Sequence, residues 1–239
     1  MKTPFKIPIA CLLSPVFVAF LCADVALAQQ ASSKPDISGF WELRFDSKSI
    51  PQAALVPKVT AKDIDAHREK DVMAIRWCNF LGVPMLMEQS PLDIRQGRIE
   101  VAISADPVSV ARHIYTDGRS HVSMDTFDPS TNGHSIGRWE GDTFVVDTIG
   151  FAPDRGVTSI PGGGYKTADS HLIERYRLLN GGKQLSVTFT WEDPNVFAKP
   201  HTYEFRYYRA PKDTNARSLA CDPFDEDRAR FLTQPLRNP

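Results

Sequence analysis

This chain of 239 residues lacks an excess of charge of either sign. Its 28 Lys and Arg side chains nearly balance its 29 Asp and Glu side chains, and no polybasic run occurs. A near-neutral chain gives no electrostatic reason to bind nucleic acid or anionic lipid. We therefore expect no nucleic-acid partner and no stable membrane insertion, and the oligomeric state is left open.

Several catalytic motifs are also missing. The sequence has no Gly-x-Ser-x-Gly nucleophile elbow, no Walker A loop and no dinucleotide fingerprint. No His-x-x-x-His pair falls on a predicted helix, and no spacing selects a metal site from His113, His121, His134 and His171. The sequence therefore predicts neither a cofactor nor a metal.

The one long apolar stretch lies at the N-terminus. Lys2 and Lys6 precede the apolar residues 7–21, and a small-residue site ends at Ala28. This order is typical of a signal peptide, and the stretch is short for a membrane span of about 20 residues. We expect cleavage after Ala28, with a retained N-terminal anchor as the alternative. The expected location is periplasmic or secreted, with a single domain over residues 29–239.

Cysteine is scarce, with four residues in total. Cys11 and Cys22 fall in the predicted signal peptide, which leaves Cys78 and Cys221. In an oxidising compartment a single remaining pair is expected to form a disulfide, and two free buried thiols are the alternative. Since there is no Cys-x-x-Cys pair, neither a thioredoxin-like site nor a zinc ribbon is expected.

Turn residues divide the rest of the chain into short segments. Thr60 and Asp63 form a capping box that predicts a helix ending near Cys78. Its packed stripe is expected to hold Ala61, Ile64, Val72 and Ile75. Alternation predicts strands over 36–45, 98–104, 110–115, 135–139, 143–148, 171–179, 184–191 and 202–209. The fold class is therefore mainly β, an antiparallel barrel or strongly curled sheet with one N-terminal helix.

Two connections are unusually long. Residues 116–133 carry many polar side chains, and residues 150–170 contain Pro161 followed by three glycines. A loop of that length in a compact domain is either disordered or functional. The second loop is therefore a candidate lid over a site.

Two resemblances add to this interpretation. The segment DISGFW at 36–41 is similar to the Gly-x-Trp opening of lipocalin barrels. In that family the Trp closes one end of the barrel beneath an Arg of the last strand, a role that Arg206 or Arg209 could take here. The resemblance implies a lipocalin-like β-barrel.

The second resemblance is more specific. The segments IYTDGR at 114–119, GHSIGRWEGDTFVVDTIGF at 133–151, HLIER at 171–175 and EDP at 192–194 resemble a large group of exported, mostly unassigned bacterial proteins. The resemblance implies one β-rich domain and supports pairing Cys78 with Cys221. The chain departs from the pattern at Lys166 and Thr167, where the pattern has His-Ser, and at His201, where it has an aromatic residue.

Four residues are candidates for catalysis. His134 and His171 begin strands next to the long loops, and a histidine at a strand mouth can act as a general base. Asp147 and Glu174 lie on otherwise apolar strand faces, where a carboxylate must be paired or protonated. The alternatives are that His134 only hydrogen-bonds the loop backbone and that the carboxylates form a purely structural ion network.

Further polar residues are candidates for substrate binding. Tyr115 and Arg119 could orient an anionic or phenolic group, and Arg138 or Arg175 could neutralise the two carboxylates. Asp193 is expected to form a turn with its own backbone, with Glu192 as a minor catalytic candidate.

These residues favour an exported barrel that binds a small apolar or aromatic molecule. It is expected to act on that molecule without a cofactor, by His and carboxylate acid–base chemistry of the lyase, isomerase or dehydratase type. The first alternative is a lipocalin-type binding protein without turnover. The second is a domain that packs on a partner in the envelope.

Overall fold

The computed structural model describes residues 34–76, 82–89, 91–105 and 108–214. The chain divides into two units after Lys34, and all other described residues belong to the second unit. The signal-peptide segment, Cys78 and Cys221 lie outside the described residues. Cleavage and the disulfide therefore stay predictions.

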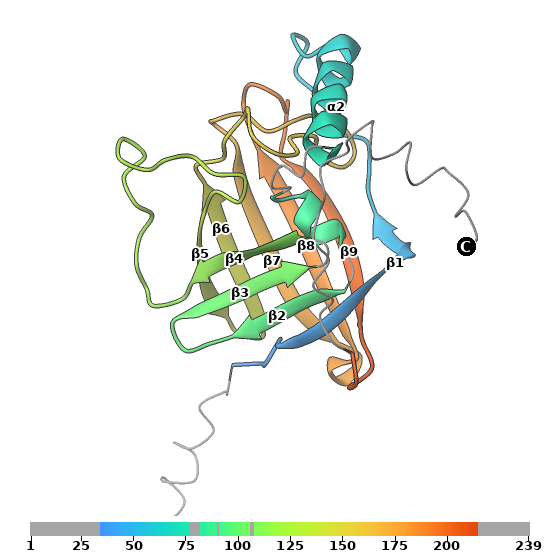
Figure 1. Ribbon diagram of the computed structural model, residues 1–239, viewed down its shortest axis with the longest axis vertical. Helices are drawn as coiled ribbons and strands as arrows, with labels where there is room; N and C mark the ends of the chain where they lie inside the picture. Colours follow the sequence, from blue (N-terminus) through green and yellow to red (C-terminus); the bar gives the residue numbers. More distant parts are fainter. Residues whose placement is uncertain (1–33, 77–81, 90, 106–107, 215–239) are drawn as a thin grey trace, which may run out of the picture. The chain divides into compact units, whose positions relative to one another are not determined.

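The second unit is a closed β-barrel in which the strands follow sequence order (Figure 1). Its strands are β1 (Gly39–Ser49), β2 (Leu92–Gln96), β3 (Glu100–Ala105), β4 (Val108–Tyr115), β5 (His134–Glu140), β6 (Thr143–Ile149), β7 (His171–Leu179), β8 (Gln184–Glu192) and β9 (His201–Arg209). Strand β1 pairs with both β2 and β9, which closes the ring. The mainly β barrel is confirmed, and β2 is the strand that the sequence prediction missed.

One junction of the barrel differs from the expected antiparallel pattern. Strands β4 and β5 pair in parallel, through only two register pairs, Ile114 with Ser135 and Tyr115 with Ile136. A parallel pair needs a long crossover connection, because the chain must return to the same end of the sheet. Residues 116–133 supply that connection. The expectation of a wholly antiparallel barrel is therefore wrong at this seam between β4 and β5.

Alternation along the strands sends large side chains into the barrel. The inward residues are mostly aromatic or aliphatic and are fully buried, among them Trp41, Phe144, Phe189, Trp191, Phe205 and Tyr207. Trp41 donates its indole N–H to the Ile37 carbonyl at 3.0 Å, and the Arg209 guanidinium lies 4.2 Å from the centroid of its ring. The Trp–Arg pair expected from the lipocalin resemblance is therefore present, with Arg209 as the arginine.

A polar network also occupies the interior. Arg112 donates to both carboxylate oxygens of Glu174, with 2.9 Å between Nη1 and Oε1, and also to the hydroxyls of Ser135 and Thr148. The Tyr176 hydroxyl donates to Glu174 at 2.8 Å. Such a buried pair is tolerated because its donors and acceptors are matched. Desolvation lowers the pKa of Arg112, but the charge and hydrogen bond of Glu174 together with Tyr176 outweigh it, so the pKa is raised and the guanidinium stays charged.

The helix α2 (Ala61–Arg76) begins with the predicted capping box. The Thr60 N–H donates to Asp63 Oδ2 at 2.8 Å, and the Asp63 N–H donates to Thr60 Oγ1 at 3.3 Å. The predicted packed stripe is wrong, because Val72 is 56% exposed and Ile75 is 45% exposed. In the described part of the chain, no helix is long and apolar enough to cross a membrane.

The packed face of α2 holds a carboxylate instead. Asp71 is buried and accepts hydrogen bonds from the N–H of Thr158, the hydroxyl of Thr158 and the N–H of Ser159, at 2.7, 3.1 and 2.9 Å. Two short 3₁₀ helices, η1 (Met85–Glu88) and η2 (Asn180–Gly182), complete the regular structure.

Candidate functional site

Five side chains form one continuous hydrogen-bonded chain. His134 Nδ1 lies 2.8 Å from His121 Nδ1, and His121 Nε2 lies 3.1 Å from Asp147 Oδ1. The same oxygen lies 2.9 Å from His171 Nε2, and His171 Nδ1 lies 3.3 Å from Glu192 Oε2. We call these five residues the relay.

The strands place four members of the relay on the outer face of the barrel. His134, Asp147, His171 and Glu192 belong to the consecutive strands β5, β6, β7 and β8. Their chain neighbours Ser135, Thr148, Leu172 and Trp191 are fully buried on the inner face. Because successive side chains of a strand point to opposite faces, the relay members face outward.

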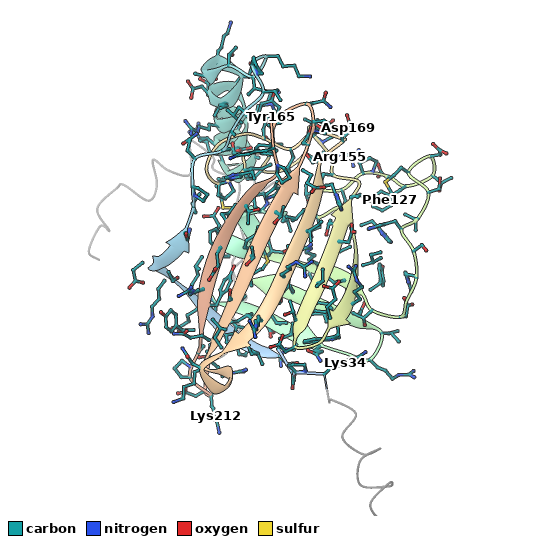
Figure 2. All side chains as sticks on the ribbon, turned by 180° about the vertical axis from the view of Figure 1, so that it is seen from behind. Lys34, Phe127, Arg155, Tyr165, Asp169 and Lys212 are labelled. Carbon is teal, nitrogen blue, oxygen red and sulfur yellow. The ribbon has the colours of Figure 1, made fainter. Side chains whose placement is uncertain are left out.

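The fifth member, His121, comes from the connection 116–133. That segment returns to the barrel where the N–H of Ala152 donates to the Ser130 carbonyl at 2.9 Å. Gly133 then turns the chain into β5 with a φ of 65°, and a Cβ there would lie 2.6 Å from the Ile149 carbonyl oxygen. Only glycine tolerates both the positive φ and the close approach of the Ile149 carbonyl oxygen, so Gly133 sets the position of His134. Phe127 belongs to the same connection and lies near the upper ends of the strands in Figure 2, and its ring centroid is 5.7 Å from that of His134.

The pKa shifts indicate how the relay is charged. The hydrogen bond from His171 holds the pKa of Asp147 below its usual value, despite partial desolvation, and His121 adds a second bond. The bond to Asp147 raises the pKa of His171, despite desolvation. Desolvation, with the nearby His121 and Arg119, lowers the pKa of His134. At neutral pH the relay therefore holds a carboxylate at Asp147 and an uncharged His134.

These charges determine the tautomers. Ionised Asp147 can only accept, so His121 donates to it from Nε2. When His121 is neutral, its Nδ1 is an acceptor, and His134 must donate from its own Nδ1. The free lone pair of His134 then lies on Nε2. The relay thus leaves His134 ready to accept a proton at that atom.

A cavity of about 350 Å³ opens beside His134. It lies at the seam between β4 and β5, under the connection 116–133. The lining residues are Ala111, His113, Tyr115, Phe127, Asp128, Ser130, Thr131, Asn132, Gly133, His134 and Ser135. The strands share only two register pairs there, so the opening follows from the way the barrel closes. We call this cavity the seam pocket.

The remaining predicted residues fall in three different places. Tyr115 lines the seam pocket, with its ring centroid 5.6 Å from that of His134, and Arg119 lies over the Tyr115 ring at 4.0 Å while pairing with Asp117. Glu174 faces the barrel interior and pairs with Arg112, so it is separate from the relay. Arg138 and Arg175 both pair with Glu140 on the surface, and the expectation that they neutralise Asp147 or Glu174 is wrong.

Sequence reasoning missed two residues of this arrangement. It considered His121 only as one of several metal-ligand candidates, although the residue connects His134 to Asp147. It did not select Arg112, which neutralises Glu174. The expected turn at Asp193 is confirmed, since Asn195 donates its N–H to Asp193 Oδ1 at 2.9 Å. The minor candidate Glu192 is the outermost member of the relay.

Lys166 is buried behind the seam pocket. Its Nζ donates to the carbonyls of Val83 at 2.6 Å and of Thr131 at 3.3 Å. Desolvation lowers its pKa to about 7, although Asp71 opposes the shift. Because Thr131 lines the pocket, Lys166 links one wall of the pocket to Val83.

Other features of the described residues do not compete with the relay as a catalytic site. A second cavity of about 430 Å³ lies between α2 and residues 157–163, and no histidine lines it. Among the described ranges, no group of three or more His, Cys, Asp and Glu side chains is placed to hold a metal ion. Comparison with protein-family models, curated proteins and solved structures finds no match to this chain.

Proposed function

We propose that this barrel is an enzyme that removes a proton from carbon in a small molecule bound in the seam pocket. The single observation that carries the proposal is the unbroken hydrogen-bonded chain from His134, in the pocket wall, to the ionised carboxylate of Asp147. Perturbed titratable groups connected in this way next to a cavity are typical of catalytic sites.

The geometry supports a stepwise role for each member. His134 Nε2 takes the proton from the carbon next to a carbonyl, and the electron pair left behind forms the enolate. The positive charge that develops on His134 is shared with His121 through the Nδ1 contact and is balanced by Asp147. Return of a proton to another carbon gives isomerisation, and loss of a β-substituent gives elimination.

The outer end of the relay lies nearer to solvent than the base does. The side chains of His171 and Glu192 are 31% and 45% exposed, whereas His134 is 7% exposed overall. Because His121 and His171 both donate from Nε2 to the same oxygen of Asp147, the relay balances the charge on His134, and the proton on His134 Nε2 leaves through the pocket.

The proposal differs in one respect from the expectation of a ligand inside the barrel. Apart from Ser135, the seam pocket is lined by the outward residues of β4, by residues of the connection 116–133 and by His134, whereas the inner face carries large buried side chains. The alternative of a binding protein without turnover uses the same pocket. The experiment below separates the two.

The test uses hydrogen exchange at carbon. Incubating the protein with 4-hydroxyacetophenone in D₂O and following the methyl signal by NMR reports proton removal next to the carbonyl. We expect the protein to accelerate exchange and His134→Gln to lower the rate by about 10²-fold or more, the usual contribution of a general base. Asp147→Asn is expected to lower it as well, because the carboxylate no longer balances the charge.

His67→Gln is the matched control. His67 belongs to α2, contacts Thr158 and does not line the seam pocket. It is expected to keep the wild-type rate. Equal rates for the wild type and His134→Gln contradict the proposal, and bound ligand with no exchange supports the binding-protein alternative.

Export and the choice of partner form part of the same proposal. The basic, apolar and small-residue order of residues 1–28 supports action in the periplasm or outside the cell. The near-neutral charge supports a small apolar or aromatic partner rather than nucleic acid.

A further inference from the structure

The walls of the seam pocket are aromatic on two sides of the base. The ring of Tyr115 lies at 31° to that of His134 with centroids 5.6 Å apart. The ring of Phe127 meets His134 edge-on at 78° with centroids 5.7 Å apart. Both Tyr115 and Phe127 are partly exposed and line the cavity. Aromatic surfaces of this kind fit a flat ring better than an aliphatic chain.

The pocket carries little charge. Of the described residues that line it, Asp128 alone has a carboxylate, and none is Lys or Arg. The Asp128 side chain is 83% exposed and lies 3.6 Å from Arg155. The lowered pKa of His134 keeps that ring uncharged. An anionic ligand would therefore find no Lys or Arg in the lining, and burying it without a partner is unfavourable.

One polar atom of the lining lacks a donor. Asn132 Oδ1 is buried, and no described residue donates a hydrogen bond to it. Buried side-chain oxygens in folded proteins are nearly always paired, so an exception in a pocket wall points to a donor on the ligand. Because the atom is an acceptor, the ligand must carry an O–H or N–H group.

We infer that the seam pocket selects a neutral aromatic molecule with a hydrogen-bond donor on or next to its ring, such as a phenol, and that Asn132 is the residue that recognises the donor. This inference rests on the proposed function only for the location of the pocket. It makes Asn132 a specificity residue and assigns it no part in the chemistry.

Three probes of similar size test the inference by calorimetric titration at pH 7. They are 4-methylphenol, 4-methylanisole, which lacks the donor, and 4-methylbenzoate, which is an anion. A phenol with a pKa near 10 stays neutral at this pH. We expect 4-methylphenol to bind at least about tenfold more tightly than either of the other two, since an unmet buried acceptor is costly.

Variants of Asn132 identify the acceptor. Asn132→Leu is expected to reduce the preference for 4-methylphenol over 4-methylanisole to about threefold or less, and Asn132→Asp keeps an acceptor and preserves the preference. Asn195→Leu removes an amide outside the pocket lining and leaves the preference unchanged. Phe127→Leu is expected to weaken the binding of 4-methylphenol and of 4-methylanisole to a similar degree.

The titrations also separate this inference from the proposed chemistry when they are repeated in His134→Gln. Suppose His134→Gln still prefers 4-methylphenol while the wild type shows no hydrogen exchange at carbon. That result overturns the proposed proton removal and leaves the inference about Asn132 intact. Equal binding of 4-methylphenol and 4-methylanisole to the wild type overturns the inference. So does an unchanged preference in a folded Asn132→Leu protein, tightest binding of 4-methylbenzoate, or no binding of any probe.

Discussion

At the scale of single residues, one carboxylate oxygen organises the site. Asp147 Oδ1 accepts from the Nε2 atoms of His121 and His171, which come from the long connection and from β7. A carboxylate that accepts two imidazole N–H groups fixes the tautomer of each ring. The orientation of the base therefore depends on a residue that does not line the seam pocket.

The charge of His171 influences the pH range in which the base, His134, is uncharged. The exchange rate needs uncharged His134, so it is expected to fall as the pH drops through the His134 pKa, which lies below the ordinary 6.5. His171 has a raised pKa, and its cation offsets the charge of Asp147. In His171→Gln the full charge of Asp147 acts on His121 and His134. The acidic limb of the pH–rate profile is then expected to move to higher pH.

A control for this shift is available on the same outer surface. Arg177→Gln removes a cation that pairs with Asp142, away from the relay. It is expected to leave the profile in place, because an exposed charge is screened by salt. An acidic limb that stays put or moves to lower pH in His171→Gln shows that His171 does not act through Asp147.

At the scale of elements, the helix α2 shows how a carboxylate can replace an apolar contact. Asp71 joins α2 to the connection 150–170 through three hydrogen bonds to Thr158 and Ser159. His67 supports the same junction, since its Nδ1 lies 2.9 Å from Thr158 Oγ1 and its ring stacks on Tyr165 at 3.9 Å. The attachment of α2 thus depends on polar pairing.

The two faces of α2 therefore respond differently to substitution. Asp71→Ala is expected to lower the free energy of unfolding by about 1–3 kcal/mol, because buried donors at Thr158 and Ser159 lose their acceptor. Val72→Gln changes an exposed side chain and is expected to stay within about 0.5 kcal/mol of the wild type. Urea unfolding of both variants measures the difference. A larger loss in Val72→Gln indicates that Val72 is covered in solution.

The helix shows why the sequence predicts some features and misses others. The capping box at Thr60 and Asp63 was predictable, because its hydrogen bonds join residues three positions apart. The packed face was not, because apolar periodicity at Val72 and Ile75 suggested a stripe that the fold leaves exposed. Periodicity cannot show that a buried Asp71 finds three donors from another segment.

At the scale of the whole molecule, the seam between β4 and β5 is the least paired junction of the barrel. It has two register pairs, compared with nine between β7 and β8. Segments held by few hydrogen bonds open locally at lower cost than the core. The seam is also where the seam pocket and His134 lie.

We expect hydrogen exchange to reveal this difference. The amides that bond across the β4–β5 seam should exchange at least about tenfold faster than those between β7 and β8, because local opening there breaks fewer bonds. Native-state exchange followed by NMR measures both sets in one experiment. Equal protection at the two junctions contradicts a weak seam.

The sequence by itself determined the mainly β class, most of the strands and the capping box. These features follow from alternation and local turns, which are properties of neighbouring residues. It left open whether the sheet closes into a barrel and whether Arg206 or Arg209 meets Trp41. It also indicated His134, His171 and Asp147 as members of one candidate catalytic site, but it grouped Glu174 with them and did not include His121.

Only the tertiary structure decided which side of the barrel each of these residues faces and which partner each one meets. It separated Glu174 from the relay and gave it Arg112, and it brought His121 from a long loop onto Asp147. The physical reason is that strand register and the path of a long loop depend on how the whole ring closes. The parallel seam that admits the pocket is a property of that closure.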